Sequence, residues 1–185
     1  ISKASIRNNR VVVACMEPRS AVVEFEEKAG RYTVHMGCQG TFGMRKQLAA
    51  LLNVEPAKVR VLTKNVGGSF GMKSFAYPEY ICLLHAAKML GRPIKWTDER
   101  SSSFLSDQQG RDHDVEGELA LDKDGNFLAV RLSLFSNMGG YLAAVGPNMA
   151  TNNMVKNITS VYKTPAIEIN TKCVFTNTTP ISAYR

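Results

Sequence analysis

A glycine-rich loop that joins a short strand to a helix constrains the fold of this chain more than any other feature. Residues 58–63 alternate apolar and polar side chains and predict a half-buried strand. Residues 77–90 predict a helix, with Pro78 in its first turn and Gly91 after its last residue. Residues 66–71 lie between them and contain three glycines, which let the backbone approach a ligand closely with N–H groups pointing at it. The segment therefore predicts a strand, a ligand-binding loop and a helix, in that order.

Neither of the two familiar phosphate-binding loops fits this segment. A P-loop requires glycine directly before its lysine, but Met72 precedes Lys73 here. A dinucleotide-binding fingerprint requires glycine at the position of Val66 and an acidic residue on a following strand, and the chain has neither. A tight turn that needs positive φ accounts for one or two glycines, whereas three glycines around Phe70 exceed what a turn requires. The loop therefore favours a binding role over a purely structural one.

The remaining segments predict a mixed α+β fold in which short strands outnumber helices. We expect strands at residues 10–16, 20–26, 31–36, 93–97, 115–121, 127–135 and 167–175. Another helix is expected over residues 42–52, ended by Asn53, whereas residues 139–153 are expected to form a loop. With 185 residues, 44% of them hydrophobic, the chain can bury a core as one domain or as two small lobes.

The two ends of the chain predict a fragment. It begins at Ile1 without an initiator Met and stops at Arg185 in the middle of a pattern. We therefore expect residues 1–185 to be part of a longer polypeptide whose remainder follows Arg185. No stretch approaches the roughly 20 apolar residues of a membrane span, and nothing at the start resembles a signal peptide.

The basic character of the chain does not amount to a nucleic-acid-binding tract. Its net charge is +7, from 23 Lys and Arg against 16 Asp and Glu. These basic residues are dispersed, and the longest run between residues 28 and 95 is the dipeptide Arg45-Lys46. A solvated surface explains such a distribution, with part of the excess facing acidic partner subunits or an anionic cofactor. A basic nucleic-acid-binding module remains an alternative on charge alone.

The cysteines exclude the close pairs of a metal site held by this chain alone. Cys15, Cys38, Cys82 and Cys173 lie far apart in the sequence, so none forms the short-spaced pair of a zinc or iron–sulfur site. The three histidines are likewise scattered, and no metal ligand is assigned. Without a disulfide framework, the chain is expected in a reducing compartment, the cytoplasm.

Taken in order, a series of short motifs resembles the molybdopterin-binding subunit of molybdenum hydroxylases of the xanthine dehydrogenase, aldehyde oxidase and carbon monoxide dehydrogenase type. Each motif is weak by itself, but their order and approximate spacing agree across nearly the whole chain. The matching segments are Asn8-Asn9-Arg10, Met16-Glu17-Pro18-Arg19, Gln39, Val59-Arg60-Val61-Leu62, Gly67-Gly68-Ser69-Phe70-Gly71-Met72-Lys73, Tyr77-Pro78-Glu79, Gly91-Arg92-Pro93-Ile94-Lys95-Trp96, Arg111-Asp112, Asp124-Gly125, Thr176-Asn177 and Ala183-Tyr184-Arg185.

The resemblance implies where the cofactor binds. Gln39 matches the glutamine whose side-chain amide donates to the apical oxo ligand of molybdenum. Phe70 and Gly71 match loop residues that lie against the metal, where backbone N–H groups meet the oxo and dithiolene region. Arg185 matches the arginine that opens a second cofactor loop. The cofactor-binding residues implied in this way are Gln39, Gly68, Ser69, Phe70, Gly71 and Arg185.

The resemblance also implies the reaction. The full enzyme would oxidise an aldehyde, an N-heterocycle or carbon monoxide with water as the oxygen source. Its molybdenum cofactor is molybdopterin or the cytosine dinucleotide form, and electrons leave through iron–sulfur clusters and FAD on partner subunits or domains. The base that acts beside the metal is a glutamate near the far end of the full subunit, so no catalytic residue lies in this chain and the fragment alone is expected to be inactive. A non-catalytic relative that acts in assembly is an alternative.

Departures from the family pattern bear on the substrate. Purine hydroxylases place a glutamate directly after the loop lysine, where this chain has Ser74. They also carry an arginine in the segment before the tyrosine that matches Tyr162, where this chain reads Asn152-Asn153-Met154-Val155. A purine substrate is therefore disfavoured. Ser69 and Met72 stand where glycines are more usual, so the approach of the loop backbone is expected to differ slightly.

Overall fold

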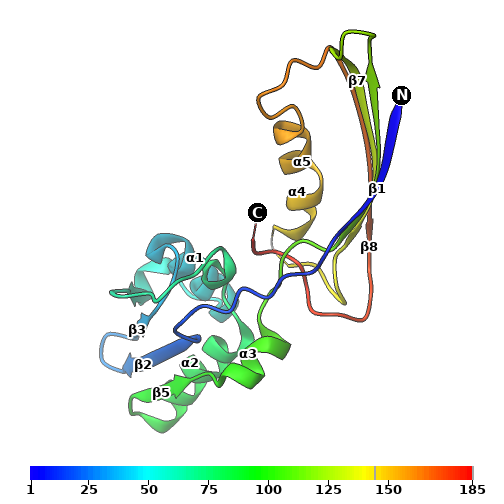
Figure 1. Cartoon of the computed structure of the whole chain (residues 1–185). Helices are drawn as coiled ribbons and strands as arrows, with labels where there is room; N and C mark the ends of the chain where they lie inside the picture. Colours follow the sequence, from blue (N-terminus) through cyan, green and yellow to red (C-terminus); the bar gives the residue numbers. More distant parts are fainter. Residues whose placement is uncertain (144, 185) are drawn as a thin grey trace. The chain divides into compact units, whose positions relative to one another are not determined.

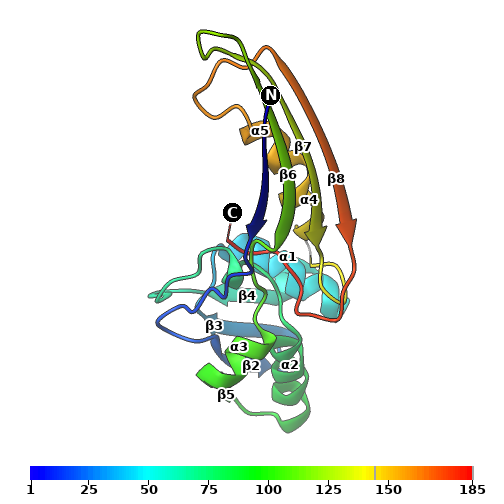
Figure 2. The same ribbon diagram turned by 45° about the vertical axis from the view of Figure 1, so that its right-hand side comes forward.

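The computed structural model describes residues 1–143 and 145–184. The chain forms two compact units. Unit 1 combines residues 1–12 with residues 108–185, and unit 2 comprises residues 13–107. Figures 1 and 2 show both units in two views. Because the first twelve residues belong to unit 1, its sheet is assembled from segments at opposite ends of the sequence.

Unit 2 is built on a four-stranded mixed sheet covered by helices. Strands β2 and β3 pair antiparallel as neighbours in sequence, β5 joins the free edge of β2 antiparallel, and β4 joins β3 parallel. Helix α1 packs against β4, and helix α2 packs against β2 and β5. The elements of unit 2 are β2 (Ser20–Glu26), β3 (Arg31–Met36), α1 (Thr41–Leu52), the 3₁₀ turn η1 (Pro56–Lys58), β4 (Val59–Leu62), the 3₁₀ turn η2 (Met72–Ser74), α2 (Pro78–Leu90), β5 (Ile94–Thr97) and α3 (Arg100–Ser106).

The core of unit 2 follows from the periodicity of its strands and helices. Val23 and Val34 face each other across β2 and β3 and are fully buried. Leu48 of α1 and Leu84 of α2 are fully buried as well. Burial of side chains of this size stabilises the fold by about 1.5–3 kcal/mol each relative to exposure. The parallel arrangement of β3 and β4 requires a crossover, and α1 provides it.

Unit 1 is a second four-stranded sheet with two short helices beside it. Strand β1 pairs antiparallel with β6, β6 forms a hairpin with β7, and β8 lies parallel to β7. Figures 1 and 2 show these strands running together, with α4 and α5 along one side of the sheet. The elements of unit 1 are β1 (Ser2–Asn8), β6 (His113–Leu121), β7 (Phe127–Asn137), α4 (Gly146–Ala150), α5 (Asn152–Asn157) and β8 (Ala166–Val174).

The mixed α+β fold predicted from the sequence is confirmed, together with most of its elements. Strands β2 and β3 have the predicted bounds, and α1, β4, α2, β5, β6, β7 and β8 lie within a few residues of theirs. Both helix ends were signalled correctly, because Asn53 and Gly91 adopt the left-handed conformation that closes α1 and α2.

The predicted strand at residues 10–16 is wrong. Only Val11 pairs there, in an isolated bridge to Gly110, and Ala14 has a positive φ of 42° that no regular strand adopts. The apolar side chains that suggested a strand serve packing instead, since Val13 and Cys15 are buried. The nearby strand β1 was missed because its side chains are mostly exposed and its sequence, SKASIRN, lacks a clear apolar alternation.

The predicted loop at residues 139–153 is also wrong, because it overlaps α4 and α5. Asparagine and glycine are weak helix formers and obscured these two short helices. Pro147, in the first turn of α4, was the available signal. Helix α3 was missed for a similar reason, since three consecutive serines lie within its seven residues.

Candidate functional site

The loop between β4 and η2 depends on a left-handed backbone. Gly67, Gly68 and Gly71 have φ of 66°, 92° and 95°. A side chain at Gly67 would overlap the Glu17 side chain, and one at Gly68 would approach the Phe70 ring to 3.0 Å. Phe70 itself has a φ of 50° although it carries a side chain, and its ring is 59% exposed. Such a conformation costs on the order of 1 kcal/mol and is typical of functional sites.

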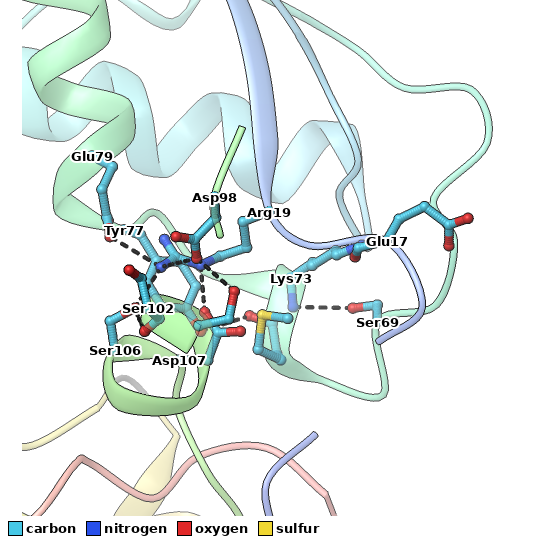
Figure 3. Close-up of polar contacts among 12 residues, drawn as sticks. Glu17, Arg19, Ser69, Lys73, Tyr77, Glu79, Asp98, Ser102, Ser106 and Asp107 are labelled. Carbon is cyan, nitrogen blue, oxygen red and sulfur yellow. Dashed lines mark hydrogen bonds and ion pairs between the residues drawn. The ribbon is translucent and has the colours of Figure 1, made fainter. Parts of the chain in front are cut away.

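Lys73 holds this loop to the segment before β2. Its ammonium donates to the backbone carbonyls of Glu17, at 2.8 Å, and Val66, at 2.7 Å. The residue is buried, and burial lowers the pKa of its amine. The Lys73 backbone contributes twice more, because its carbonyl accepts from the Gln39 N–H and its N–H donates to the Ser69 hydroxyl. Figure 3 shows Lys73 beside Ser69 and Glu17. Lys73 therefore fixes both ends of the loop.

The side chain of Gln39 receives three donors at its carbonyl oxygen. The Ser69 hydroxyl donates to Oε1 at 2.6 Å, the Gly71 N–H at 2.9 Å and the Ser74 hydroxyl at 3.2 Å. Because a backbone N–H can only donate, the atom facing Gly71 must be the oxygen of the amide and not its nitrogen. We call Gln39, Ser69, Gly71 and Ser74 the Gln39 cluster.

The amide nitrogen of Gln39 is left to donate elsewhere. The residue is exposed, and Nε2 makes no hydrogen bond with any of the described residues 1–143 and 145–184. The Gly71 N–H, which the family resemblance placed against the cofactor, is directed at Gln39 in the structure. What this part of the loop presents outward is therefore a neutral amide donor and the ring of Phe70.

A further glutamine, Gln47, holds the chain after the loop. Its Nε2 donates to the Ser74 carbonyl at 3.1 Å, and its Oε1 accepts from the Ala76 N–H at 3.0 Å. Sequence reasoning did not single out Gln47. Its position on α1, facing the end of the loop, becomes apparent only when α1 and residues 72–76 are brought together.

A second polar cluster in unit 2 is buried around Arg19. The Arg19 side chain has no exposed surface and donates to Asp107 at 2.5 Å, Glu79 at 3.0 Å and Asp98 at 3.2 Å (Figure 3). Its guanidinium also lies over the ring of Tyr77, 3.9 Å from the ring centre. We call Arg19, Glu79, Asp98, Asp107 and Tyr77 the Arg19 cluster. Arg19 and Glu79 belonged to the motif series, but their burial was not predicted.

The titration behaviour of the Arg19 cluster reflects burial opposed by ion pairing. Burial alone would lower the pKa of Arg19, but its pairs with Glu79 and Asp107 raise it. Burial would raise the pKa of Glu79, and the Arg19 hydrogen bond and charge bring it below its usual value. For Asp107 burial prevails, and the pKa is raised. The cluster connects β2, α2 and the segments at either side of α3.

In unit 1 the motif residues form a network that ties distant segments of the chain. Arg10 donates to Asp112 at 3.0 Å and to the hydroxyl of Thr178 at 2.6 Å. Asn137 at the end of β7 donates to the same Asp112 carboxylate at 2.8 Å. Residues from the start, the middle and the end of the sequence thereby hold the connection after β8. Two of the matching motifs, Asn8-Asn9-Arg10 and Arg111-Asp112, thus have a structural role in this unit.

The segment that leads to Arg185 is buried in unit 1. Ile181 and Ala183 are 2% and 3% exposed. Side chains at Gly110 and Gly139 would approach Ala183 and Pro180 to less than 3 Å, so these two glycines make room for the segment. Arg185 itself lies outside the described residues.

A comparison with known families decides what these elements belong to. A model of the molybdopterin cofactor-binding domain matches residues 1–185. This chain belongs to that family. The family predicted from the ordered motifs is thereby confirmed, and the molybdenum cofactor is the group that such a domain binds.

Relatives of known activity support the assignment. The chain is 35% identical over 176 residues to the 6-hydroxypseudooxynicotine dehydrogenase complex subunit gamma of Paenarthrobacter nicotinovorans, covering 92% of this chain and 21% of the relative. It is 29% identical over 171 residues to the carbon monoxide dehydrogenase large chain of Hydrogenophaga pseudoflava, with the same coverage of 92% and 21%. The chain therefore spans about a fifth of the length of these curated relatives.

Solved structures show the same fold. Quinoline 2-oxidoreductase from Pseudomonas putida 86 superposes with a TM-score of 0.90 at 29% identity, covering 100% of this chain and 24% of that one. Carbon monoxide dehydrogenase from Oligotropha carboxidovorans superposes with a TM-score of 0.91 at 27% identity, covering 99% of this chain and 23% of that one. No helix among the described residues is long and apolar enough to cross a membrane.

The donor set of the Gln39 cluster fits a molybdenum cofactor. A metal–oxo centre favours neutral donors that orient it without adding a ligand, and Gln39 Nε2 is such a donor. Gly67 and Gly68 let the loop pack closely against Glu17 and Phe70, and the left-handed backbone places the Gly71 N–H on Gln39 Oε1, which leaves Nε2 as the donor available to a cofactor. Within the described residues, no group of three or more His, Cys, Asp and Glu side chains could hold a metal ion directly.

Proposed function

We propose that this molybdopterin cofactor-binding domain is part of the large subunit of a molybdenum hydroxylase and that Gln39 Nε2 would donate a hydrogen bond to an oxo group of the molybdenum cofactor. The observation that carries the proposal is the orientation of the Gln39 amide: three donors occupy its carbonyl oxygen, while its amide nitrogen makes no hydrogen bond within the described residues. A hydrogen bond of this kind to a charged centre contributes about 1.5–3 kcal/mol.

Each residue of the loop has a distinct part in this proposal. When bound, the cofactor supplies a two-electron oxidation in which the oxygen comes from water. Gln39 orients the cofactor, and Gly68, Ser69 and Gly71 shape the loop that receives it. The exposed ring of Phe70 excludes water from one side. Arg185 would open the second cofactor loop, and the general base would come from the rest of the subunit, so the fragment alone is inactive.

We further propose that the substrate is an N-heterocycle, an aldehyde or carbon monoxide and not a purine. Ser74 stands where purine hydroxylases carry a glutamate, and its hydroxyl is directed at Gln39. Asn153 and Met154 of α5 occupy the stretch where those enzymes carry an arginine, and they line a cavity of about 490 Å³ in unit 1. The names of the relatives do not separate these classes, since they include a nicotine 6-hydroxylase, carbon monoxide dehydrogenases and a probable xanthine dehydrogenase subunit, so the proposal rests on Ser74 and on residues 152–155.

The proposed partners are iron–sulfur and flavin subunits that carry the electrons away. The relatives include a subunit of a dehydrogenase complex and the large chains of carbon monoxide dehydrogenases, which supports assembly with further chains. The proposal includes a cytoplasmic location and a cofactor in the molybdopterin or cytosine dinucleotide form. Because the basic side chains are dispersed, a nucleic-acid-binding module has little support.

Metal analysis tests this proposal. The full-length subunit would be co-expressed with the products of its neighbouring genes, purified as a complex, analysed for molybdenum, iron and flavin, and assayed with quinoline, an aromatic aldehyde, carbon monoxide and xanthine. The expected result is near-stoichiometric molybdenum with turnover of one of the first three substrates. Absence of molybdenum, in a host that loads a known molybdenum hydroxylase, would instead establish a non-catalytic relative that acts in assembly.

A further inference from the structure

Ser69 makes two hydrogen bonds that a glycine at this position could not make. Its hydroxyl accepts from the Lys73 backbone N–H at 3.1 Å and donates to Gln39 Oε1 at 2.6 Å. The residue is 9% exposed, so water does not compete strongly for this hydroxyl. The contact with Gln39 is the shortest of the three that converge on the amide oxygen.

The direction of the two bonds is fixed by chemistry. The Lys73 N–H has a hydrogen to give and no lone pair to offer, so Ser69 Oγ must be the acceptor there. The single hydroxyl hydrogen of Ser69 is then available for Gln39 alone. Lys73 is buried and its ammonium is bonded to the carbonyls of Glu17 and Val66, so the backbone N–H that binds Ser69 has a fixed position.

We propose that Ser69 is a positioning residue. Its hydroxyl links the fixed backbone of Lys73 to the Gln39 amide, and it holds this amide in the orientation that presents the nitrogen to the cofactor. The inference rests on the proposed function, because it assumes that Gln39 Nε2 faces the molybdenum cofactor. Loss of the hydroxyl leaves only the Gly71 N–H and the longer Ser74 contact on Oε1. The side chain of Gln39 then samples other rotamers and donates less often.

The test uses the complete holoenzyme with single substitutions at Ser69. Ser69→Ala removes the hydroxyl, Ser69→Gly removes the whole side chain, and Ser69→Thr keeps the hydroxyl. Ser133→Ala, on an exposed position of β7, is the matched control. The measurements are molybdenum content, kcat and KM separately, and the electron paramagnetic resonance spectrum of the Mo(V) state, which reports on the oxo environment.

For Ser69→Ala and Ser69→Gly we expect full molybdenum content and a shifted Mo(V) spectrum, with kcat lowered about three- to tenfold and KM little changed. Ser69→Thr, which keeps the hydroxyl, should have the wild-type kcat and Mo(V) spectrum. Unchanged kcat and spectrum in a loaded Ser69→Ala or Ser69→Gly enzyme overturn the inference. If both variants load poorly, Ser69 shapes the loop instead of positioning Gln39, and the inference is overturned as well.

A double-mutant cycle separates this inference from the proposed function. If Ser69 acts through Gln39, Ser69→Ala has no further effect on kcat in a Gln39→Ala enzyme. An equal loss in both backgrounds means that Ser69 acts by another route, and the inference fails while Gln39 keeps its role. If Gln39→Ala alone leaves kcat and the Mo(V) spectrum unchanged, the proposed function of Gln39 fails first.

Discussion

The Arg19 cluster and the Gln39 cluster both gather polar groups around one side chain of unit 2, with opposite results. Arg19 is completely buried, and three carboxylates and an aromatic ring surround its guanidinium. Gln39 is exposed, and the donors around it occupy only the oxygen of its amide. Within the described residues, the Arg19 cluster encloses its charge but leaves Arg19 Nη1 and Glu79 Oε2 buried without a hydrogen-bond partner. The Gln39 cluster instead leaves the amide nitrogen of an exposed residue without a partner among those residues.

The difference shows how a structural cluster can be distinguished from a binding one. A buried charge must be paired by the protein itself, because water cannot solvate it. An exposed amide needs no such pairing, so three donors on its oxygen serve to orient it and not to compensate for burial. The Arg19 cluster should therefore determine stability, and the Gln39 cluster should determine what the cofactor contacts. The predictions below are ordered by their expected effect on stability.

Removal of the Arg19 charge should have the largest effect. Arg19→Met leaves Asp98 and Asp107 buried without their partner, and breaking a buried ion pair in this way costs about 3–5 kcal/mol. We expect a large fall in the denaturant midpoint of the purified subunit. Arg31→Met, which removes a pair with Glu26 that is about half exposed, is the control and should change the midpoint little. Equal denaturant midpoints for Arg19→Met and Arg31→Met would contradict the view that the Arg19 cluster determines stability.

A side chain at Gly71 should have an intermediate effect on stability and a large one on cofactor content. Gly71→Val forces a β-branched residue to a φ of 95°, at a cost of about 1–3 kcal/mol, and adds a side chain next to Gln39, where the proposal puts the cofactor. We expect most of the molybdenum to be lost. Gly43→Val, at a position of α1 with open space around it, is the control and should retain the metal. Normal molybdenum content in the Gly71 variant would refute the loop assignment.

The pH dependence of stability should change more modestly through Glu79. Its pKa is lowered in the folded state, so the pair with Arg19 stabilises the fold above the usual carboxylate pKa of 4.5 and loses this contribution as the pH falls below it. The difference in unfolding free energy between wild type and Glu79→Gln should therefore shrink as the pH falls through this range. A constant difference from neutral pH to about pH 3 would show that the carboxylate charge of Glu79 contributes nothing.

The sequence predicted features that depend on local patterns and missed those that depend on burial. The bounds of β2 and β3 followed from alternating side chains. Positive φ was expected to account for only one or two of the loop glycines, but all three of Gly67, Gly68 and Gly71 adopt it. Arg19 was part of a motif, but no local pattern shows that a charged residue is enclosed. The hydrogen bond from Ser69 to Gln39 could not be predicted either, because it joins residues about thirty positions apart in the sequence.

The missed elements have the same physical origin. Strand β1 pairs with β6, more than a hundred residues later in the chain, and gains its order from that partner and not from its own composition. The network of Arg10, Asp112, Asn137 and Thr178 explains two of the motifs in unit 1, yet its members span most of the sequence. Their spacing alone gave no indication that they meet.

The most direct test of the central claim is Gln39→Glu in the complete holoenzyme, measured as kcat per molybdenum. The substitution keeps an oxygen acceptor for Ser69, Gly71 and Ser74 but replaces the outward amide donor with a negatively charged oxygen. The account predicts an unchanged denaturant midpoint and a loss of turnover on the order of 100-fold. A molybdenum-loaded Gln39→Glu enzyme that turns over at the wild-type rate would contradict it.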